Sequence, residues 1–194
     1  MNTQSLLSPT VASLAIIRDN PRAPSGAAIR HVAVFLASIA RCGKHHFQIH
    51  EQAFPGSEDG KDVADWLGNV IPQGADIALR SVSSLFNPLT LREEPAPWWP
   101  IADMAWLRQR FGEEPRIWTL DLSDSDIFET VKAMELPCAV PGNAWQVRAA
   151  HAAGEAQAIW YQLLTLTCDD DEIDGHIAGW RAYISAEQAR AVAT

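Results

Sequence analysis

The sequence is poor in cysteine and has no long hydrophobic run. Its three cysteines, Cys42, Cys138 and Cys168, are far apart, which fits reduced thiols better than a disulfide framework or a zinc site. The longest apolar run, Val32–Ala40, is much shorter than the roughly 20 residues that a membrane helix needs. Residues 1–8 have no basic stretch and no clear cleavage site, so no signal peptide is expected. These absences favour a cytoplasmic protein without a membrane partner.

Several catalytic sequence motifs are also missing. There is no glycine-rich phosphate loop, no Gly-x-Ser-x-Gly motif and no cysteine–histidine pair at a recognisable spacing. Nucleotide kinases, Rossmann dehydrogenases and serine hydrolases are therefore excluded. The formal net charge of −9 argues against a general polyanion binder. Lysine is scarce, with three residues against 12 arginines, a bias that suits bidentate phosphate contacts but also follows from a GC-rich genome.

Three apolar and β-branched runs near the start of the chain predict strands. They are Val11–Ile17, His31–Ala40 and His46–Phe54. The segment Arg41–Lys44 between the last two contains a glycine and is typical of a hairpin turn. We therefore expect Val32–Ile39 and His46–Ala53 to pair as antiparallel strands, with the first run beside Val32–Ile39.

The rest of the chain is mostly helical in pattern. Apolar residues recur at helical spacing from Val63 to Val70, and further patterns predict strands at Ile77–Leu79 and Arg116–Leu122 and helical segments at Val82–Phe86, Met104–Phe111, Ser123–Glu135 and Ala144–Thr167. Ser123 or Asp124 is the expected N-cap of its helix. The acidic run Asp169–Asp174 is expected to form a loop, with a short helix starting at Ser185. Strands followed mainly by helices indicate an α/β or α+β domain.

Three segments carry a resemblance to a known family. Ile29–Gly56 (IRHVAVFLASIARCGKHHFQIHEQAFPG) combines an apolar strand, a short turn and a polar strand that ends at Pro-Gly. Asp62–Leu79 is laid out as a helix and a strand, and Ala149–Leu164 (AAHAAGEAQAIWYQLL) resembles an "H-x-A-x-x-D-A" helix. Together they resemble the DnaQ-like 3′–5′ exonucleases. The resemblance implies an α/β fold of the ribonuclease H-like type, with a mixed sheet of about five strands flanked by helices. It also implies a single domain over residues 1–194, with a core at about 11–167 and a C-terminal helical extension at 168–194.

The resemblance also implies a metal-dependent site. Members of the family hold two divalent cations, Mg²⁺ or Mn²⁺, with four carboxylates, and a histidine or tyrosine orients the attacking water. In this chain the resemblance assigns Asp19 and Glu155 as metal ligands and His151, one helical turn before Glu155, as the residue that orients the water. The first strand lacks the Asp-x-Glu pair, and serines follow the strand near Ile77 where the next aspartate is expected. We therefore expect a divergent 3′–5′ exonuclease-like protein, active or inactive, that acts on or binds single-stranded DNA or RNA ends.

Each of these residues has a second interpretation. His151 and Glu155 also fit an exposed pair on a helix, and Asp19 also fits a turn residue that bonds its own backbone. Trp98 and Trp99 lie in a proline-rich segment, where they would either stack on bases or pack a loop onto the core. The alternative function is a non-catalytic protein-interaction domain that uses an acidic surface and this tryptophan-rich loop.

Overall fold

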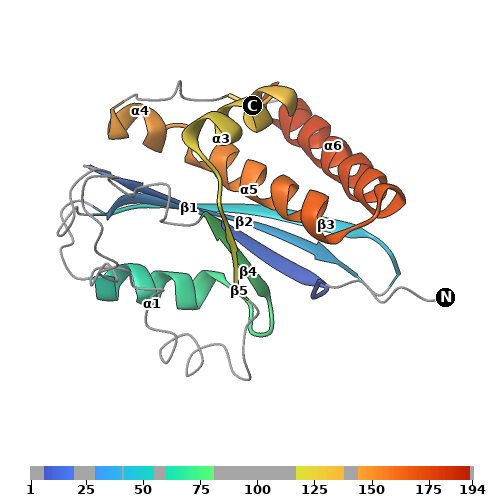
Figure 1. The fold of residues 1–194 in the computed structure, drawn as a ribbon, viewed down its shortest axis with the longest axis horizontal. Helices are drawn as coiled ribbons and strands as arrows, with labels where there is room; N and C mark the ends of the chain where they lie inside the picture. Colours follow the sequence, from blue (N-terminus) through green and yellow to red (C-terminus); the bar gives the residue numbers. More distant parts are fainter. Residues whose placement is uncertain are drawn as a thin grey trace.

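The computed structural model has a five-stranded sheet at its centre (Figure 1). It describes residues 7–19, 29–40, 42–54, 60–80, 117–137 and 144–192. The strands are β1 (Thr10–Arg18), β2 (Ile29–Ile39), β3 (His45–Ala53), β4 (Asp76–Arg80) and β5 (Ile117–Leu120). The helices are α1 (Gly60–Val70), α3 (Asp124–Ala133), α4 (Trp145–Ala149), α5 (Ala152–Thr167) and α6 (Asp170–Val192). An α/β fold with a mixed sheet and flanking helices is therefore confirmed.

The sheet has the strand order β3-β2-β1-β4-β5. β1 pairs antiparallel with β2, and β2 with β3, so the predicted hairpin and the predicted place of the first strand are both confirmed. The hairpin turn contains Gly43 at φ 79°, a left-handed conformation that favours glycine. β4 and β5 run parallel to β1. The carboxyl ends of β1, β4 and β5 therefore meet at one edge of the sheet.

Helices cover both faces of the sheet (Figure 1). α1 lies on one face, and α3, α4, α5 and α6 lie on the other, which is called the α5 face below. Successive residues of β1 point to opposite faces, so Ala15 and Ile17 pack toward α5 whereas Leu14 packs toward α1. β1, β2 and β4 are therefore mostly buried and apolar, whereas the edge strand β3 is largely polar and exposed.

The predicted single helix over Ala144–Thr167 is wrong, because the structure divides it in two. α4 ends at Ala149, Ala150 and His151 form a turn, and α5 then begins. The apolar spacing continues through the turn, so it does not reveal the change of direction. This change lets α4 reach the ends of β1 and β2, while α5 stays on the middle of the sheet.

The predicted acidic loop is also wrong, because Asp170 begins the long helix α6. The side chain of Asp169 accepts a hydrogen bond from the Glu172 N–H at 2.9 Å, and acidic residues suit the positive end of a helix dipole. The helix continues through Ser185, so no new helix starts there. α6 packs on β3, and the indole of Trp180 donates a 2.8 Å hydrogen bond to Gln157 of α5.

Other predictions have mixed outcomes. The N-cap is Ser123, in a reciprocal capping box with Asp126, which confirms the predicted start of α3. The helical segments predicted at Val82–Phe86 and Met104–Phe111, and the proline-rich segment that contains Trp98 and Trp99, lie outside the described residues. No helix in the part of the chain that the structure describes is long and apolar enough to cross a membrane.

Replacing Gly154 of α5 with alanine is expected to lower the free energy of unfolding by about 1–3 kcal/mol. A Cβ there would lie 2.9 Å from the backbone oxygen of Pro137, so the backbone has to move. Gly175 of α6 is the matched control, since nothing lies within 4 Å of its added Cβ. Gly175→Ala is expected to be neutral or to stabilise by up to about 1 kcal/mol. Urea denaturation of both variants measures the difference; equal stabilities would contradict the close contact at Gly154.

Candidate functional site

Charged side chains gather at the carboxyl edge of the parallel strands, on the α5 face. Arg80 is the last residue of β4, Asp124 the first of α3, Arg148 belongs to α4, and Glu155 lies in the first turn of α5. We call these residues the arginine–carboxylate cluster. In open α/β sheets, ligands bind outside the carboxyl ends of the strands, so the cluster lies where a functional site is expected.

Glu155 lies between two guanidinium groups. Nη2 of Arg148 donates to both carboxylate oxygens of Glu155 at 3.2 Å, and Nη1 of Arg80 is 3.9 Å from Oε1 of the same residue. The side chain of Glu155 is only 13% exposed, and each arginine side chain is 18% exposed. Because water is largely excluded, these charges interact more strongly than they would on an open surface.

Arg80 ties three elements of the cluster together. Its Nε donates to the backbone carbonyl of Leu122, just after β5. Its Nη1 donates to Oδ1 of Asp124 at 2.6 Å. The cluster thus has two cationic and two anionic side chains, which balance each other.

The turn between α4 and α5 allows Arg148 to reach Glu155. The two residues are seven positions apart, which on an unbroken helix corresponds to about two turns, roughly 10 Å along the axis. The turn at Ala150 and His151 bends the chain and closes this gap. If residues 144–167 are read as one long helix, the ion pair between Arg148 and Glu155 is therefore not expected.

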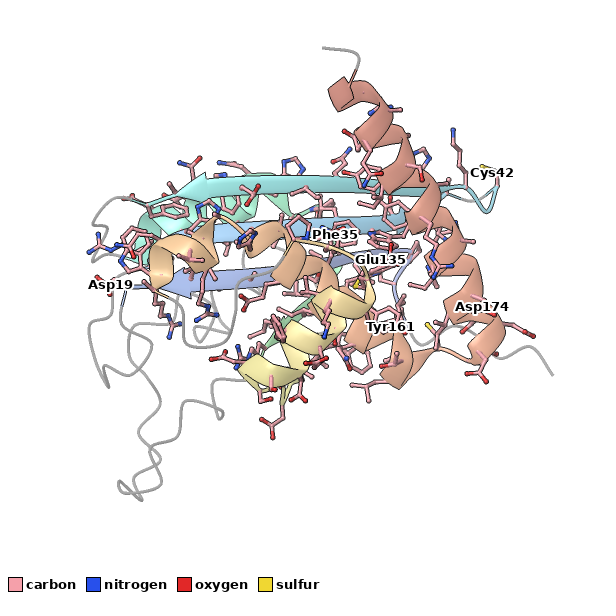
Figure 2. The ribbon with its side chains drawn as sticks, turned by 90° about the horizontal axis from the view of Figure 1, so that it is seen from above. Asp19, Phe35, Cys42, Glu135, Tyr161 and Asp174 are labelled. Carbon is pink, nitrogen blue, oxygen red and sulfur yellow. The ribbon has the colours of Figure 1, made fainter. Side chains whose placement is uncertain are left out.

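Asp19 lies in a separate ion pair. Nε and Nη2 of Arg30 donate to Oδ2 of Asp19 at 3.1 and 2.7 Å. The guanidinium of Arg30 also lies 5.8 Å from the ring centroid of Trp145, a cation–π distance. Figure 2 shows Asp19 at the end of the sheet next to α4, opposite the end where Cys42 and Asp174 lie.

The structure gives Asp19 and Glu155 different arginine partners. In the parallel register Leu14 lies beside Leu79, so Arg80 is level with Ala15. Asp19 is four positions farther along the chain than Ala15, on the order of 13 Å in extended conformation. Two ligands of one Mg²⁺ each lie about 2.1 Å from the ion. Among the described residues, no three His, Cys, Asp or Glu side chains form a group that could hold a metal.

The first strand presents no carboxylate to the cluster. Its residues on the α5 face include Ser13, Ala15 and Ile17, and Ser13 Oγ donates a 2.7 Å hydrogen bond to the carbonyl of Ala156. The residues described at this edge therefore do not fit the two-cation centre that the family resemblance implies. They fit a site in which arginine supplies the positive charge.

The other predicted site residues have limited or no contact with the cluster. His151 is the half-buried N-cap residue of α5, and its backbone carbonyl accepts a hydrogen bond from the Glu155 N–H at 3.2 Å. Its side chain makes no capping hydrogen bond. Trp98 and Trp99 lie outside the described residues.

The sequence interpretation missed Arg80, Arg148 and Arg30 as site residues. Arg80 directly follows an apolar strand, and a charged residue at a strand's carboxyl end is a usable signal. Arg148 and Arg30 have no comparable signal in the sequence. Arg148 meets Glu155 because of the turn between α4 and α5, and Arg30 meets Asp19 because β1 and β2 are paired. Each ion pair therefore depends on the three-dimensional arrangement.

The pKa of Asp124 depends on the arginines. Partial burial acts to raise it, but the hydrogen bond from Arg80 and the charges of Arg80 and Arg148 outweigh burial and hold the pKa below its ordinary value. A carboxyl group whose pKa is lower in the folded than in the unfolded chain stabilises the fold above its unfolded pKa, near 3.8. This contribution is lost as the pH falls through the folded pKa.

Asp124→Asn is therefore expected to destabilise the protein modestly at pH 7, and the difference from the unmodified protein should shrink only below about pH 4, as the pH falls through the lowered pKa of the folded state. The side chain is 51% exposed, so the effect is small. Asp171→Asn, in the first turn of α6, controls for a lost charge at a helix start. Thermal unfolding measured from pH 3 to 8 gives the comparison; an Asp124 effect that is independent of pH would contradict the ion pair.

Comparisons with known proteins do not add a family assignment. No model of a known protein family matches the chain, and no curated protein matches it either. The order of the elements and the arginine–carboxylate cluster are therefore the features of the chain that bear on its function.

Proposed function

We propose that the chain is a divergent exonuclease-like protein with a ribonuclease H-like fold, which binds single-stranded nucleic acid ends and cuts them slowly or not at all. The order β1-β2-β3-α1-β4, with a long helix on the sheet near the end of the chain, supports this proposal. It is the layout on which the family resemblance depends. The observation that carries the proposal is the position of the arginine–carboxylate cluster at the carboxyl edge of the parallel strands.

The composition of the cluster favours phosphate as its ligand. The planar guanidinium group presents N–H donors in a fork that matches phosphate oxygens. Arg80 and Arg148 come from different elements and both approach Glu155, so their guanidinium groups lie near each other. A phosphate of a nucleic acid backbone would find two such forks at one place.

The same cluster explains why cleavage should be weak. Two-cation phosphodiester hydrolysis uses clustered carboxylates to hold the ions that activate water and stabilise the leaving oxygen. Here Glu155 is engaged by arginines, Asp19 is engaged by Arg30, and β1 offers no acid on the α5 face. Any metal-dependent step would have to break these ion pairs first.

Fluorescence anisotropy with a 5′-labelled 12-nucleotide single strand, DNA or RNA, tests the proposal. At low salt we expect binding in EDTA, and the affinity should fall steeply as salt rises because phosphate contacts release counterions. The same strand incubated with Mn²⁺ should stay largely intact on a denaturing gel. Rapid shortening from the 3′ end would contradict the weak-cleavage part of the proposal.

A protein-interaction role is the second candidate function. The exposed acidic residues Asp169, Asp170, Asp171 and Asp174 surround the start of α6, far from Asp19 (Figure 2). Such a surface would suit a basic protein partner and would repel nucleic acid. Failure to bind any single strand at low salt would make this the better explanation.

A further inference from the structure

The metal ions implied by the resemblance have a substitute in this chain. Glu155 already accepts two hydrogen bonds from Arg148 and has Arg80 close by, so guanidinium groups balance its negative charge without a metal ion. Both arginines are mostly shielded from solvent. A divalent ion would have to displace guanidinium groups from a partly buried carboxylate.

We infer that the arginine–carboxylate cluster binds a phosphate group directly, without a divalent ion, and that Glu155 competes with this phosphate for Arg148. This inference rests on the proposed binding of nucleic acid ends. In the absence of ligand, the carboxylate of Glu155 holds the guanidinium of Arg148, as a phosphate would. When a terminal phosphate arrives, it takes over these donors.

The charge balance of the cluster predicts the direction in which a substitution at Glu155 changes the affinity for phosphate. With Arg80, Arg148, Asp124 and Glu155 all ionised, the cluster is neutral overall. Glu155→Gln removes one negative charge and frees donors of Arg148, which leaves a net positive site. A neutral glutamine would thus improve phosphate binding. If Glu155 were a metal ligand, the same change would instead weaken binding in the presence of Mg²⁺.

The test measures binding of a 3′-phosphorylated, 5′-labelled 12-nucleotide DNA strand in EDTA, with inorganic phosphate as competitor. Glu155→Gln is expected to bind several-fold more tightly than the unmodified protein, and Arg148→Gln about tenfold more weakly, since a charge-assisted hydrogen bond is lost. Arg148→Lys, which keeps the charge but not the fork, should fall between them. Adding Mg²⁺ should not increase the affinity.

Arg190→Gln is the matched control, because Arg190 is an exposed arginine near the end of α6 whose side chain is 74% exposed. It should leave the affinity unchanged within about twofold, and circular dichroism should show that each variant is folded. If the strand binds but Glu155→Gln weakens binding, or if binding requires Mg²⁺, the inference is wrong while the proposed function stands. If neither Glu155→Gln nor Arg148→Gln changes the affinity for the strand, the inference is also wrong and the proposed function still stands. If no variant binds any strand, the proposed function fails as well.

Discussion

Replacing Trp160 with alanine is expected to lower the free energy of unfolding by about 3–5 kcal/mol. Trp160 lies in α5 and is 1% exposed. Its ring packs edge-on against Phe35 of β2 at 5.3 Å and against Phe47 of β3 at 5.7 Å between centroids. The change would remove the largest side chain that joins α5 to the sheet, and it would leave a cavity that these rings fill only in part.

Leu166 provides the control for this prediction. It lies near the end of the same helix, but its exposed fraction is 68%, so Leu166→Ala should change stability by less than about 0.5 kcal/mol. Urea denaturation followed by fluorescence or circular dichroism measures both variants. A loss below 1 kcal/mol for Trp160→Ala would mean that α5 does not pack on the sheet as described.

Arg148→Gln is expected to lower the free energy of unfolding by about 2–3 kcal/mol, because it leaves the partly buried carboxylate of Glu155 with Arg80 as its one arginine neighbour among the described residues. This loss of stability is at or below the low end of what is found when one partner of a buried ion pair is removed, because both side chains keep some contact with water. Glu155→Gln should cost less, and the double variant should recover part of the loss. The coupling energy from this double-mutant cycle is expected to be about 1–2 kcal/mol.

Glu187 and Arg190 of α6 form a matched control pair. They are one helical turn apart and their side chains are 45% and 74% exposed. The same cycle with glutamine at both positions should give a coupling energy of no more than about 0.5 kcal/mol. If the two cycles give equal coupling energies, the ion pair between Arg148 and Glu155 is no stronger than an exposed surface pair, which would contradict the account of the cluster.

The strands and α3 could be predicted because their signals are local. The turn at Gly43 joins two strand-like runs, and the capping box at Ser123 fixes the start of a helix within four residues. The helix break at His151 could not be predicted, because small and apolar residues continue on both sides of it. The acidic start of α6 is ambiguous in the sequence, because a run of acidic side chains fits a surface loop and is also favoured in the first turn of a helix.

The candidate site was only partly predictable, for a related reason. The sequence singles out Glu155 because it lies on a segment that resembles a family motif. Its partners Arg80 and Arg148 come from a strand and from a separate short helix, so no spacing along the sequence links them to it. Asp19 stands out in the sequence as an isolated acid, but its partner Arg30 lies on the neighbouring strand and reaches it through the pairing of β1 and β2.

Whether arginine or a divalent ion neutralises Glu155 is measured most directly by titrating Mn²⁺ into the protein in a calorimeter. With Arg148 and Arg80 at the carboxylate, we expect no more than one weak site, and Glu155→Gln should leave the titration unchanged. Two tight Mn²⁺ sites that disappear in Glu155→Gln would show instead that the carboxylate binds metal and that the arginines give way to it.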